Sequence, residues 1–287
     1  HRGHFGGGCV RWGGAGGWGE GEQSWDWGAG GRLALGVLFP AVCLGCEADL
    51  ALDVAVAQER ARLGEGGVSL WFCERCRQRL SLVKGCRCGR CALPLVWFLD
   101  ELPQDRATVC EGCTERVPSW ETARAVFEFG GAGKKAVSRL KEVQWPARGL
   151  ASLMVNVVLE ADPVEEALWQ DAVVVAAPGD PKRVRRRGFD QAAVLARLVA
   201  RGLGLEEPVV ALRRTRLVAA QRGLDRKHRL NNLKHVFEVV RPEAVEGRRV
   251  IFVDDVMTTG ATAEEACRAL RQVGASVSLV LVAARAP

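Results

Sequence analysis

One segment near the end of the chain combines the side chains best suited to chemistry, with the sequence V-I-F-V-D-D-V-M-T-T-G-A-T at residues 250–262. Four apolar residues predict a strand, Asp254 and Asp255 follow at its carboxyl end, and a Thr/Gly turn opens the next helix. Ligands of open α/β sheets collect at the carboxyl ends of strands. Backbone N–H groups, hydroxyls and the positive end of a helix dipole together suit a phosphate. We therefore predict a phosphate cradle made of Thr258, Thr259, Gly260, Ala261 and Thr262.

The two carboxylates before the cradle predict a different contact. Asp254 and Asp255 cannot be phosphate ligands themselves, but they can accept hydrogen bonds from sugar hydroxyls, directly or through Mg²⁺ and water. Phosphate and ribose side by side indicate a ribose 5-phosphate, and the two aspartates are the predicted catalytic residues. The alternative is that the pair merely caps the helix predicted to begin at Ala263, but caps rarely come as an adjacent pair so far upstream.

Eight of the eleven cysteines form four C-x-x-C pairs. Two intervening residues let both sulfurs bind one ion from a tight knuckle, whereas this spacing is awkward for a structural disulfide. Four copies favour two structural Zn²⁺ sites over a redox motif, which usually occurs once. Interleaved pairing stays open, because spacing defines the pairs and not their partners. The expected ligands are Cys43, Cys46, Cys73 and Cys76 for one ion, and Cys88, Cys91, Cys110 and Cys113 for the other.

These groups need elements to position them, and the chain from residue 124 onward has the pattern of an α/β domain. Three glycines at positions 130, 131 and 133 predict a turn, and the helix after it should place Val137, Leu140 and Val143 on one face. Strands alternating with helices indicate a parallel, doubly wound sheet. The expected strands are Arg124–Phe129, Ala172–Ala177, Val250–Val253 and Ser276–Ala283, and the expected helices are Lys134–Val143, Gln191–Arg201 and Ala263–Val273.

Composition excludes several classes of protein. The chain has 287 residues, of which 48% are hydrophobic, so it can bury a core in one large domain or two smaller ones. A formal net charge of +6 is too small for a histone-like chain, and nucleic-acid affinity would have to come from local clusters. The longest apolar stretch, Leu33–Leu44, is too short to span a bilayer and contains Pro40. We predict a cytoplasmic protein without a membrane span.

The chain divides into three regions. Residues 1–36 are rich in glycine and tryptophan without periodicity and begin at His1, which predicts a disordered tail or translated upstream sequence, with a Gly/Trp interaction segment as the weaker alternative. Residues 37–118 hold the C-x-x-C pairs and one short predicted helix, Ala48–Leu63, as expected of a small module in which metal bonds replace a large core. Residues 119–287 form the predicted α/β domain.

Several motifs carry a resemblance to known proteins. Residues 250–262 resemble the phosphoribosyl pyrophosphate (PRPP) signature of type I phosphoribosyltransferases (PRTases). The chain from about residue 37 to 283 resembles the ComF/GntX family, through L-F-P-A-V-C-L-G-C at 38–46, R-G-F-D-Q at 187–191 and Q-R-G-L-D-R at 221–226. Two departures stand out: the loop after the strand at 173–177 reads P-G-D-P, and Asp190 replaces the usual Asn.

The resemblance implies a double zinc ribbon before a PRTase-like parallel-sheet domain. It also implies an enzyme of the glycosyltransferase class that binds PRPP with Mg²⁺ and transfers the phosphoribosyl group with release of pyrophosphate. The loop after the strand at 173–177 and the basic stretch at 221–226 would hold the pyrophosphate. The residues expected to do so are Pro178, Gly179, Asp180, Lys182, Arg222 and Arg226.

A non-catalytic alternative stays open. Resemblance to ComF also implies a competence protein that helps single-stranded DNA enter the cytoplasm beside a helicase-like partner, with the pocket binding DNA or sensing PRPP. Basic side chains gather at 182–187 and 213–234, and such clusters beside zinc ribbons suit single-stranded nucleic acid. Each of these arginines can equally belong to a solvated helix face. Only Phe189 and Phe237 could stack on bases there, which weakens the DNA interpretation.

Overall fold

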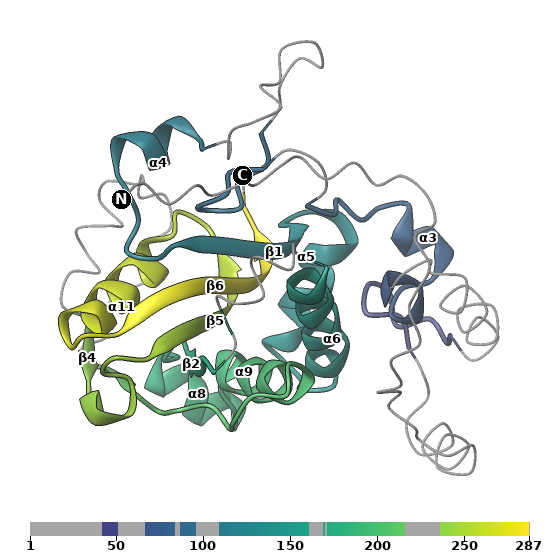
Figure 1. The fold of residues 1–287 in the computed structure, drawn as a ribbon. Helices are drawn as coiled ribbons and strands as arrows, with labels where there is room; N and C mark the ends of the chain where they lie inside the picture. The colour runs from purple at the N-terminus through teal and green to yellow at the C-terminus, as the bar shows by residue number, and fades with distance from the viewer. Residues whose placement is uncertain are drawn as a thin grey trace, which may run out of the picture.

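The fold comes from a computed structural model of the chain, which describes residues 42–50, 67–83, 87–95, 109–160, 169, 171–215 and 236–286 (Figure 1). Several predictions lie outside these residues. They are the Gly/Trp tail at 1–36, most of the helix expected over Ala48–Leu63, and the basic stretch at 221–226 with Arg222 and Arg226.

Four strands form one parallel sheet in the order β1-β6-β5-β2. β5 and β6 lie at its centre, and the apolar runs of both strands are buried on both faces, as expected of a parallel sheet covered by helices. The predicted parallel α/β class is therefore confirmed. The strands are β1 (Thr122–Glu128), β2 (Val173–Ala176), β5 (Arg249–Met257) and β6 (Ser276–Arg285). A separate antiparallel pair joins β3 (Leu212–Arg214) to β4 (Phe237–Val239).

Helices cover both faces of the sheet (Figure 1). α5 (Gly131–Leu140), α6 (Pro146–Leu159) and α9 (Gln191–Gly202) pack on one face, against side chains that include Ile251 and Leu279. α11 (Ala261–Gln272) packs on the other face, against the alternate side chains Phe252 and Val280. The short α8 (Pro181–Arg187) follows β2 and has no buried side chain. Because β2 and β5 are parallel neighbours, the loops that follow them lie at the same edge of the sheet.

The described part of the cysteine region contains short elements, which are η1 (Gly67–Leu70), α3 (Glu74–Arg77) and α4 (Glu111–Glu115). A further short helix, η2 (Pro242–Ala244), precedes β5. Part of this region pairs with the sheet, because the Val83 N–H donates to the Val126 carbonyl at 3.1 Å. The boundary at residue 118 stays a prediction. None of the helices in the described ranges combines the length and apolarity needed to cross a membrane.

The turn predicted from glycines 130, 131 and 133 is right only for Gly130, which lies in the bend between β1 and α5. α5 begins at Gly131, and Val143, expected on its apolar face, lies beyond its end and is 41% exposed. A Cβ at Gly131 would lie 2.1 Å from the Arg79 carbonyl oxygen, and one at Gly133 would lie 2.9 Å from the Phe127 ring. These glycines therefore permit close packing in the first turn of a helix. A local pattern cannot reveal that requirement, because the neighbouring atoms come from other elements.

Candidate functional site

The acidic pair lies inside β5, two residues before the strand ends. The longer β6 lies beside it and keeps the backbone extended as far as Met257. The backbone N–H of Asp255 donates to Asp254 Oδ1 at 2.8 Å, and Lys141 Nζ at the end of α5 lies 3.5 Å from Asp255 Oδ2. Burial, followed by the nearby Asp255 carboxylate, raises the pKa of Asp254 well above its ordinary value. A cation or hydroxyl donors of a ligand would therefore stabilise the ionised pair.

The predicted phosphate cradle, residues 258–262, joins β5 to α11. Gly260 precedes the helix with φ +77°, in the left-handed region that favours glycine, and no side chain caps this helix end. Thr258 is exposed, while Thr259 Oγ1 accepts a hydrogen bond from the Ala261 N–H at 3.4 Å. The twelve-residue α11 directs its first N–H groups toward this turn. The geometry suits an anion at a helix N-terminus.

The predicted pyrophosphate loop follows β2 and lies beside the acidic pair, because Ala176 pairs with Val253 in the sheet. Asp190 connects this loop to α9. Its Oδ2 accepts from the Gly179 N–H at 2.8 Å, and its Oδ1 accepts from the N–H groups of Ala192 and Ala193 at 3.0 and 3.4 Å. A carboxylate has two acceptor oxygens for these three bonds, whereas Asn has one. The departure to Asp190 therefore has a structural use.

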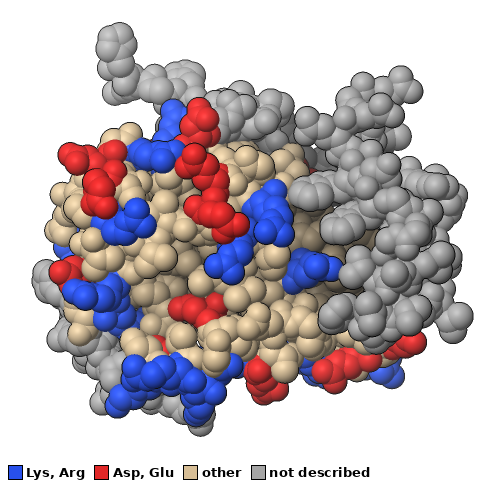
Figure 2. Space-filling model, turned by 90° about the horizontal axis from the view of Figure 1, so that it is seen from below, with Lys and Arg blue, Asp and Glu red and all other residues tan. Residues whose placement is uncertain are grey.

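Asp180 acts in the structure as the N-cap of α8. Its Oδ1 accepts from the N–H groups of Lys182 and Arg183 at 2.9 and 3.4 Å. Desolvation raises the pKa of Asp180, but these two hydrogen bonds outweigh it and leave the pKa below its ordinary value. Four basic side chains of α8 are exposed and Arg187 is half-buried. The exposed ones are Lys182, Arg183, Arg185 and Arg186. Figure 2 shows that Lys and Arg side chains gather at the lower edge of the face seen from below.

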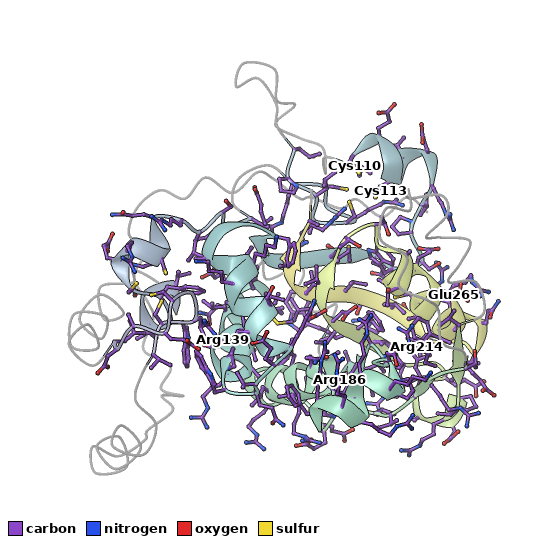
Figure 3. The ribbon with its side chains drawn as sticks, turned by 180° about the vertical axis from the view of Figure 1, so that it is seen from behind. Cys110, Cys113, Arg139, Arg186, Arg214 and Glu265 are labelled. Carbon is purple, nitrogen blue, oxygen red and sulfur yellow. The ribbon has the colours of Figure 1, made fainter. Side chains whose placement is uncertain are left out.

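Arg214, at the end of β3, is a site residue that sequence reasoning missed. Its Nε and Nη2 donate to the Pro178 carbonyl at 3.4 and 3.3 Å, and its guanidinium lies 5.0 Å from the centre of the Phe237 ring. Burial lowers its pKa, although the carboxylates of Asp180, Asp254 and Asp190 oppose this. Arg214, labelled in Figure 3, thus supports the predicted pyrophosphate loop through the Pro178 carbonyl. It also lies in the electrostatic field of the Asp180, Asp254 and Asp190 carboxylates. Its position in a run of basic residues was the only available signal.

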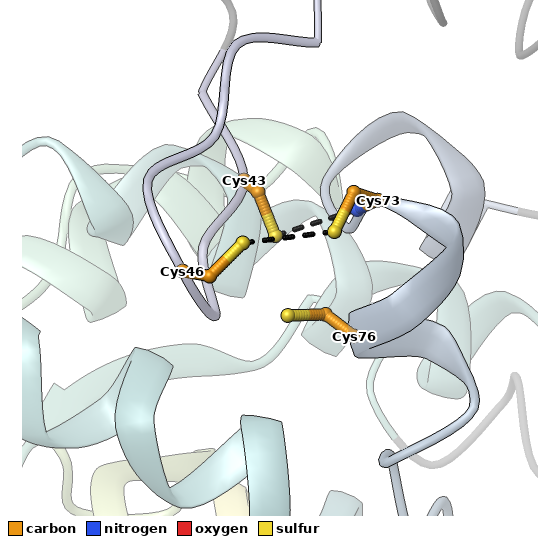
Figure 4. A group of neighbouring side chains, drawn as sticks. All are labelled: Cys43, Cys46, Cys73 and Cys76. Carbon is orange, nitrogen blue, oxygen red and sulfur yellow. Dashed lines mark hydrogen bonds between the residues drawn. The ribbon is translucent and has the colours of Figure 1, made fainter.

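The cysteines gather in the two predicted groups of four. The first tetrad is Cys43, Cys46, Cys73 and Cys76 (Figure 4), and the second tetrad is Cys88, Cys91, Cys110 and Cys113. In each, the sulfurs lie within 4.8 Å of one another. The Sγ–Sγ distance is 3.6 Å for one pair in each group. Four sulfurs around a tetrahedral Zn²⁺ are about 3.8 Å apart, as bonds of about 2.3 Å require.

The environment of the tetrads also fits a cation. A backbone N–H donates to a sulfur in each, from Cys73 to Cys43 Sγ at 3.3 Å and from Cys110 to Cys88 Sγ at 3.4 Å. The Ala48 backbone lowers the pKa of Cys46 to about 7, whereas burial raises the pKa of Cys76. A divalent cation would remove this conflict, because it stabilises all four thiolates together. Each tetrad can therefore hold a zinc ion.

A parallel sheet with an acidic pair and an anion-binding turn, joined to two four-cysteine clusters, defines a PRTase-type α/β protein with a double zinc-ribbon module. The phosphoribosyl transferase domain family matches residues 190–286. Competence protein F of Haemophilus influenzae is 30% identical over 230 residues, which cover 75% of this chain and 96% of that protein. The chain therefore belongs to the ComF family.

Two further relatives match over slightly longer stretches. DNA utilization protein YhgH of Salmonella typhimurium is 30% identical over 239 residues, covering 83% of this chain and 93% of that protein. Competence protein ComFC of Bacillus subtilis is 25% identical over 256 residues, covering 85% and 94% of the two chains. The similarity thus extends over the cysteine module as well as the PRTase domain.

Proposed function

We propose that this protein binds PRPP with Mg²⁺ and transfers its phosphoribosyl group to a nucleophile, with release of pyrophosphate. The observation that carries the proposal is the position of the acidic pair beside two segments: the cradle, whose helix N-terminus suits an anion, and the loop after β2, which leads into the basic helix α8. Asp254 and Asp255 lie on β5, the cradle follows them directly, and the loop after β2 lies beside them. A sugar with phosphate at one end and pyrophosphate at the other needs this order of groups.

Each part of the site has a distinct task in this reaction. The cradle holds the 5-phosphate through the N-terminus of α11, and the acidic pair accepts hydrogen bonds from the ribose hydroxyls. The carboxylates of Asp254 and Asp255 are also the oxygen ligands suited to Mg²⁺, which would neutralise charge on the leaving group. Pro178, Gly179, Asp180 and Lys182 form one part of the proposed leaving-group site. Arg222 and Arg226, which lie outside the described residues, are the other residues proposed to bind the pyrophosphate.

The transfer step itself is a substitution at the sugar C1. The nucleophile donates an electron pair to C1, the bond from C1 to the pyrophosphate oxygen breaks, and pyrophosphate leaves with that electron pair. Arg214 stabilises the loop that faces the departing charge, through its two hydrogen bonds to the Pro178 carbonyl. Arg214 therefore acts through the loop that it positions, and a site held in place before the reaction stabilises developing charge without reorganising.

The test is the double variant Asp254→Asn plus Asp255→Asn, which is nearly isosteric. We expect it to lose PRPP/Mg²⁺ binding in calorimetric titration, because amides neither bind Mg²⁺ as well nor accept as many hydrogen bonds. Glu206→Gln plus Glu207→Gln is the control, since these exposed carboxylates lie after α9 and away from the acidic pair. Unchanged PRPP affinity in the aspartate variant would refute the assignment of the site.

Exposed α8 favours a second candidate, the handling of single-stranded DNA. Among the described residues, only Arg183 of its five basic side chains has an ion pair, with Asp180 at 3.9 Å. The relatives' names, Competence protein F and DNA utilization protein, agree with a DNA-related role. A helicase-like partner is part of this second proposal. Changing Arg185, Arg186 and Arg187 to Ser should weaken single-stranded DNA binding and reduce its salt dependence. If DNA affinity and its salt slope stay unchanged, this candidate fails.

The cysteine tetrads support the assignment of two structural zinc sites. We propose one structural zinc ion in each, and elemental analysis of anaerobically purified protein should find two per chain. All cysteines in the described ranges are free thiols, which fits the reducing cytoplasm. A metal content below one per chain would overturn the zinc assignment.

A further inference from the structure

The knuckle of the second tetrad is held by the sheet domain through three consecutive carbonyl groups. These belong to residues 89 and 90, which lie between Cys88 and Cys91, and to Cys91 itself. Their donors are Thr122 Oγ1 at 2.7 Å, Trp120 Nε1 at 2.6 Å and Arg285 Nε at 3.0 Å. All three donors come from β6, β1 or the residues just before β1. Three side chains of the PRTase domain thus bind three successive carbonyls of the knuckle backbone.

Two of these donors, Arg285 and Trp120, also lie against the end of β5 and the phosphate cradle. Arg285 Nη1 donates to the Met257 carbonyl at 3.3 Å and, in addition, to the Thr258 carbonyl. The Trp120 ring lies 3.6 Å from the position that a Cβ on Gly260 would occupy. Arg285 and Trp120 are each only 7% exposed. A buried guanidinium must keep its acceptors, so the position of the knuckle and that of residues 257–258 depend on each other.

A second connection joins the same tetrad to the first turn of α11. Glu264 accepts hydrogen bonds from the Ser119 backbone N–H at 3.0 Å and from Ser119 Oγ at 2.9 Å. Arg116, three residues after the last cysteine ligand, lies 3.9 Å from the Glu264 carboxylate. The cradle is therefore held on its β5 side and on its α11 side by residues that contact or follow the tetrad.

Among the residues that the structure describes, few apolar side chains support the second tetrad. Its buried cluster consists of three cysteines, with Leu93, Leu95 and Val109 packed against it. A module this small needs a metal to maintain its backbone. A hollow lies between the tetrad and the cradle, lined by Cys91, Cys113, Trp120, Gly260 and Arg285 among others. Loss of the metal would therefore release the acceptors of Arg285 and Trp120 directly beside the cradle.

We propose that the second tetrad is a positioning element of the ligand site: its bound metal orders the knuckle, and the knuckle orients Arg285 and Trp120, which hold the cradle for the phosphate group of a sugar phosphate. Arg285 is a positioning residue, since it acts through the cradle backbone. The identity of the ligand rests on the proposed function. The coupling between the tetrad and the cradle does not.

Arg285→Met tests the coupling, and Arg139→Met is a matched control. Arg139 also donates to a knuckle carbonyl, that of Leu44 at 2.9 Å, but it does so in the first tetrad and on α5. In the ligand-free, zinc-loaded protein, we expect Arg285→Met to speed amide hydrogen exchange at residues 258–264. It should also weaken ribose 5-phosphate and PRPP/Mg²⁺ binding by about tenfold, the size of one lost charged hydrogen bond.

The control should leave both readouts at their wild-type values even if its melting temperature falls. Arg285→Lys should restore part of the affinity, because it keeps one cationic donor. Trp120→Phe keeps an aromatic ring but removes the N–H bonded to the Arg90 carbonyl and shortens the side chain that faces Gly260, so it carries the test if Arg285→Met does not fold. In Trp120→Phe we expect amide hydrogen exchange at residues 258–264 to rise by a smaller factor than in Arg285→Met.

The outcomes separate the two proposals. Unchanged exchange and affinity in Arg285→Met and Trp120→Phe would overturn the coupling, as would an equal effect of Arg139→Met. If exchange rises in the Arg285 variant while wild type binds neither sugar phosphate, the coupling stands and the proposed function fails.

Discussion

The two cysteine tetrads have the same ligand set and similar geometry, but they attach to the PRTase domain in different ways. The first tetrad belongs to the main core, since Cys43 and Phe72 are 0% and 1% exposed and cluster with side chains of α5 and α6. The second forms a small cluster of its own and is held by hydrogen bonds to backbone carbonyls. Two clusters with the same four ligands can therefore have different structural roles, because different side chains surround each of them.

The packing around the first tetrad explains its expected role. The Phe72 ring meets Phe127 of β1 edge to face, with centroids 5.7 Å apart. Gly149 of α6 permits close approach of Trp71, because a Cβ there would lie 2.7 Å from the indole. The first tetrad thus completes an apolar interface on the face opposite α11. Its loss should unfold this interface, whereas loss of the second should mainly change the ligand site.

The largest effect should follow removal of the first tetrad by Cys43→Ser plus Cys76→Ser. We expect the free energy of unfolding to fall by at least about 4 kcal/mol, because metal bonds are lost and two hydroxyls enter an apolar cluster. Urea denaturation would measure this. Cys267→Ser is the control, as Cys267 is buried on α11 and belongs to neither tetrad. Equal destabilisation by the control would show that the first tetrad contributes no metal-dependent stability.

Removal of the second tetrad by Cys110→Ser plus Cys113→Ser should be milder. We expect the free energy of unfolding to fall by about 2 kcal/mol, since fewer apolar side chains depend on it. Stabilisation by PRPP/Mg²⁺, worth about 2.7 kcal/mol at a hundredfold excess over the dissociation constant, should disappear. Thermal melts with and without ligand would measure both. A variant that retains full ligand stabilisation would make the two tetrads equivalent.

A smaller effect should follow substitution of Gly260, and α11 supplies its control. Gly260 and Gly274 flank the two ends of this helix with φ +77° and +86°. Valine at either position should cost about 1–2 kcal/mol of unfolding free energy, because both positions need the left-handed conformation. Only Gly260→Val should abolish PRPP binding in calorimetry. Binding by Gly260→Val, or its loss in Gly274→Val, would contradict the assignment of the cradle.

The smallest effect on stability should come from Asp254→Asn, with the opposite sign. Burial, then the Asp255 carboxylate, raises the pKa of Asp254, so the folded protein binds this proton more tightly than the unfolded chain. Its contribution to stability is then lost as the pH rises from the ordinary carboxyl pKa through the raised one. At neutral pH the variant should therefore be more stable, by about 1–2 kcal/mol at most.

That advantage should shrink as the pH falls and vanish near the ordinary carboxyl pKa of about 4. Urea unfolding across this range would measure it. Asp255→Asn has a different expectation, because it removes the partner of Lys141 at 3.5 Å. A pH-independent difference between wild type and Asp254→Asn would show that the carboxyl titrates normally. Ionisation of Asp254 would then not destabilise the fold, in contrast to the stabilisation expected from the tetrads.

The residues of the candidate site that the sequence predicted are close together along the chain. Asp254, Asp255 and the cradle fall within thirteen residues, where a strand, an acidic pair and a Thr/Gly turn follow in order. The cysteine ligands are likewise recognisable, because C-x-x-C is a local spacing with a geometric meaning. The parallel sheet followed from apolar runs alternating with helical patterns. In each case the physical requirement is satisfied by neighbours in sequence.

Only the tertiary structure could assign the residues that act across long separations. Arg285 lies 194 positions from Cys91, whose carbonyl it contacts. Arg214 of β3 donates to the Pro178 carbonyl in the loop after β2. Lys141 at the end of α5 lies beside Asp255 of β5. Nothing local marks these side chains, since their acceptors approach only when the sheet forms. Local geometry determined which groups could bind a phosphate or a metal, and the packing of distant strands decided which of the two tetrads lies beside the cradle.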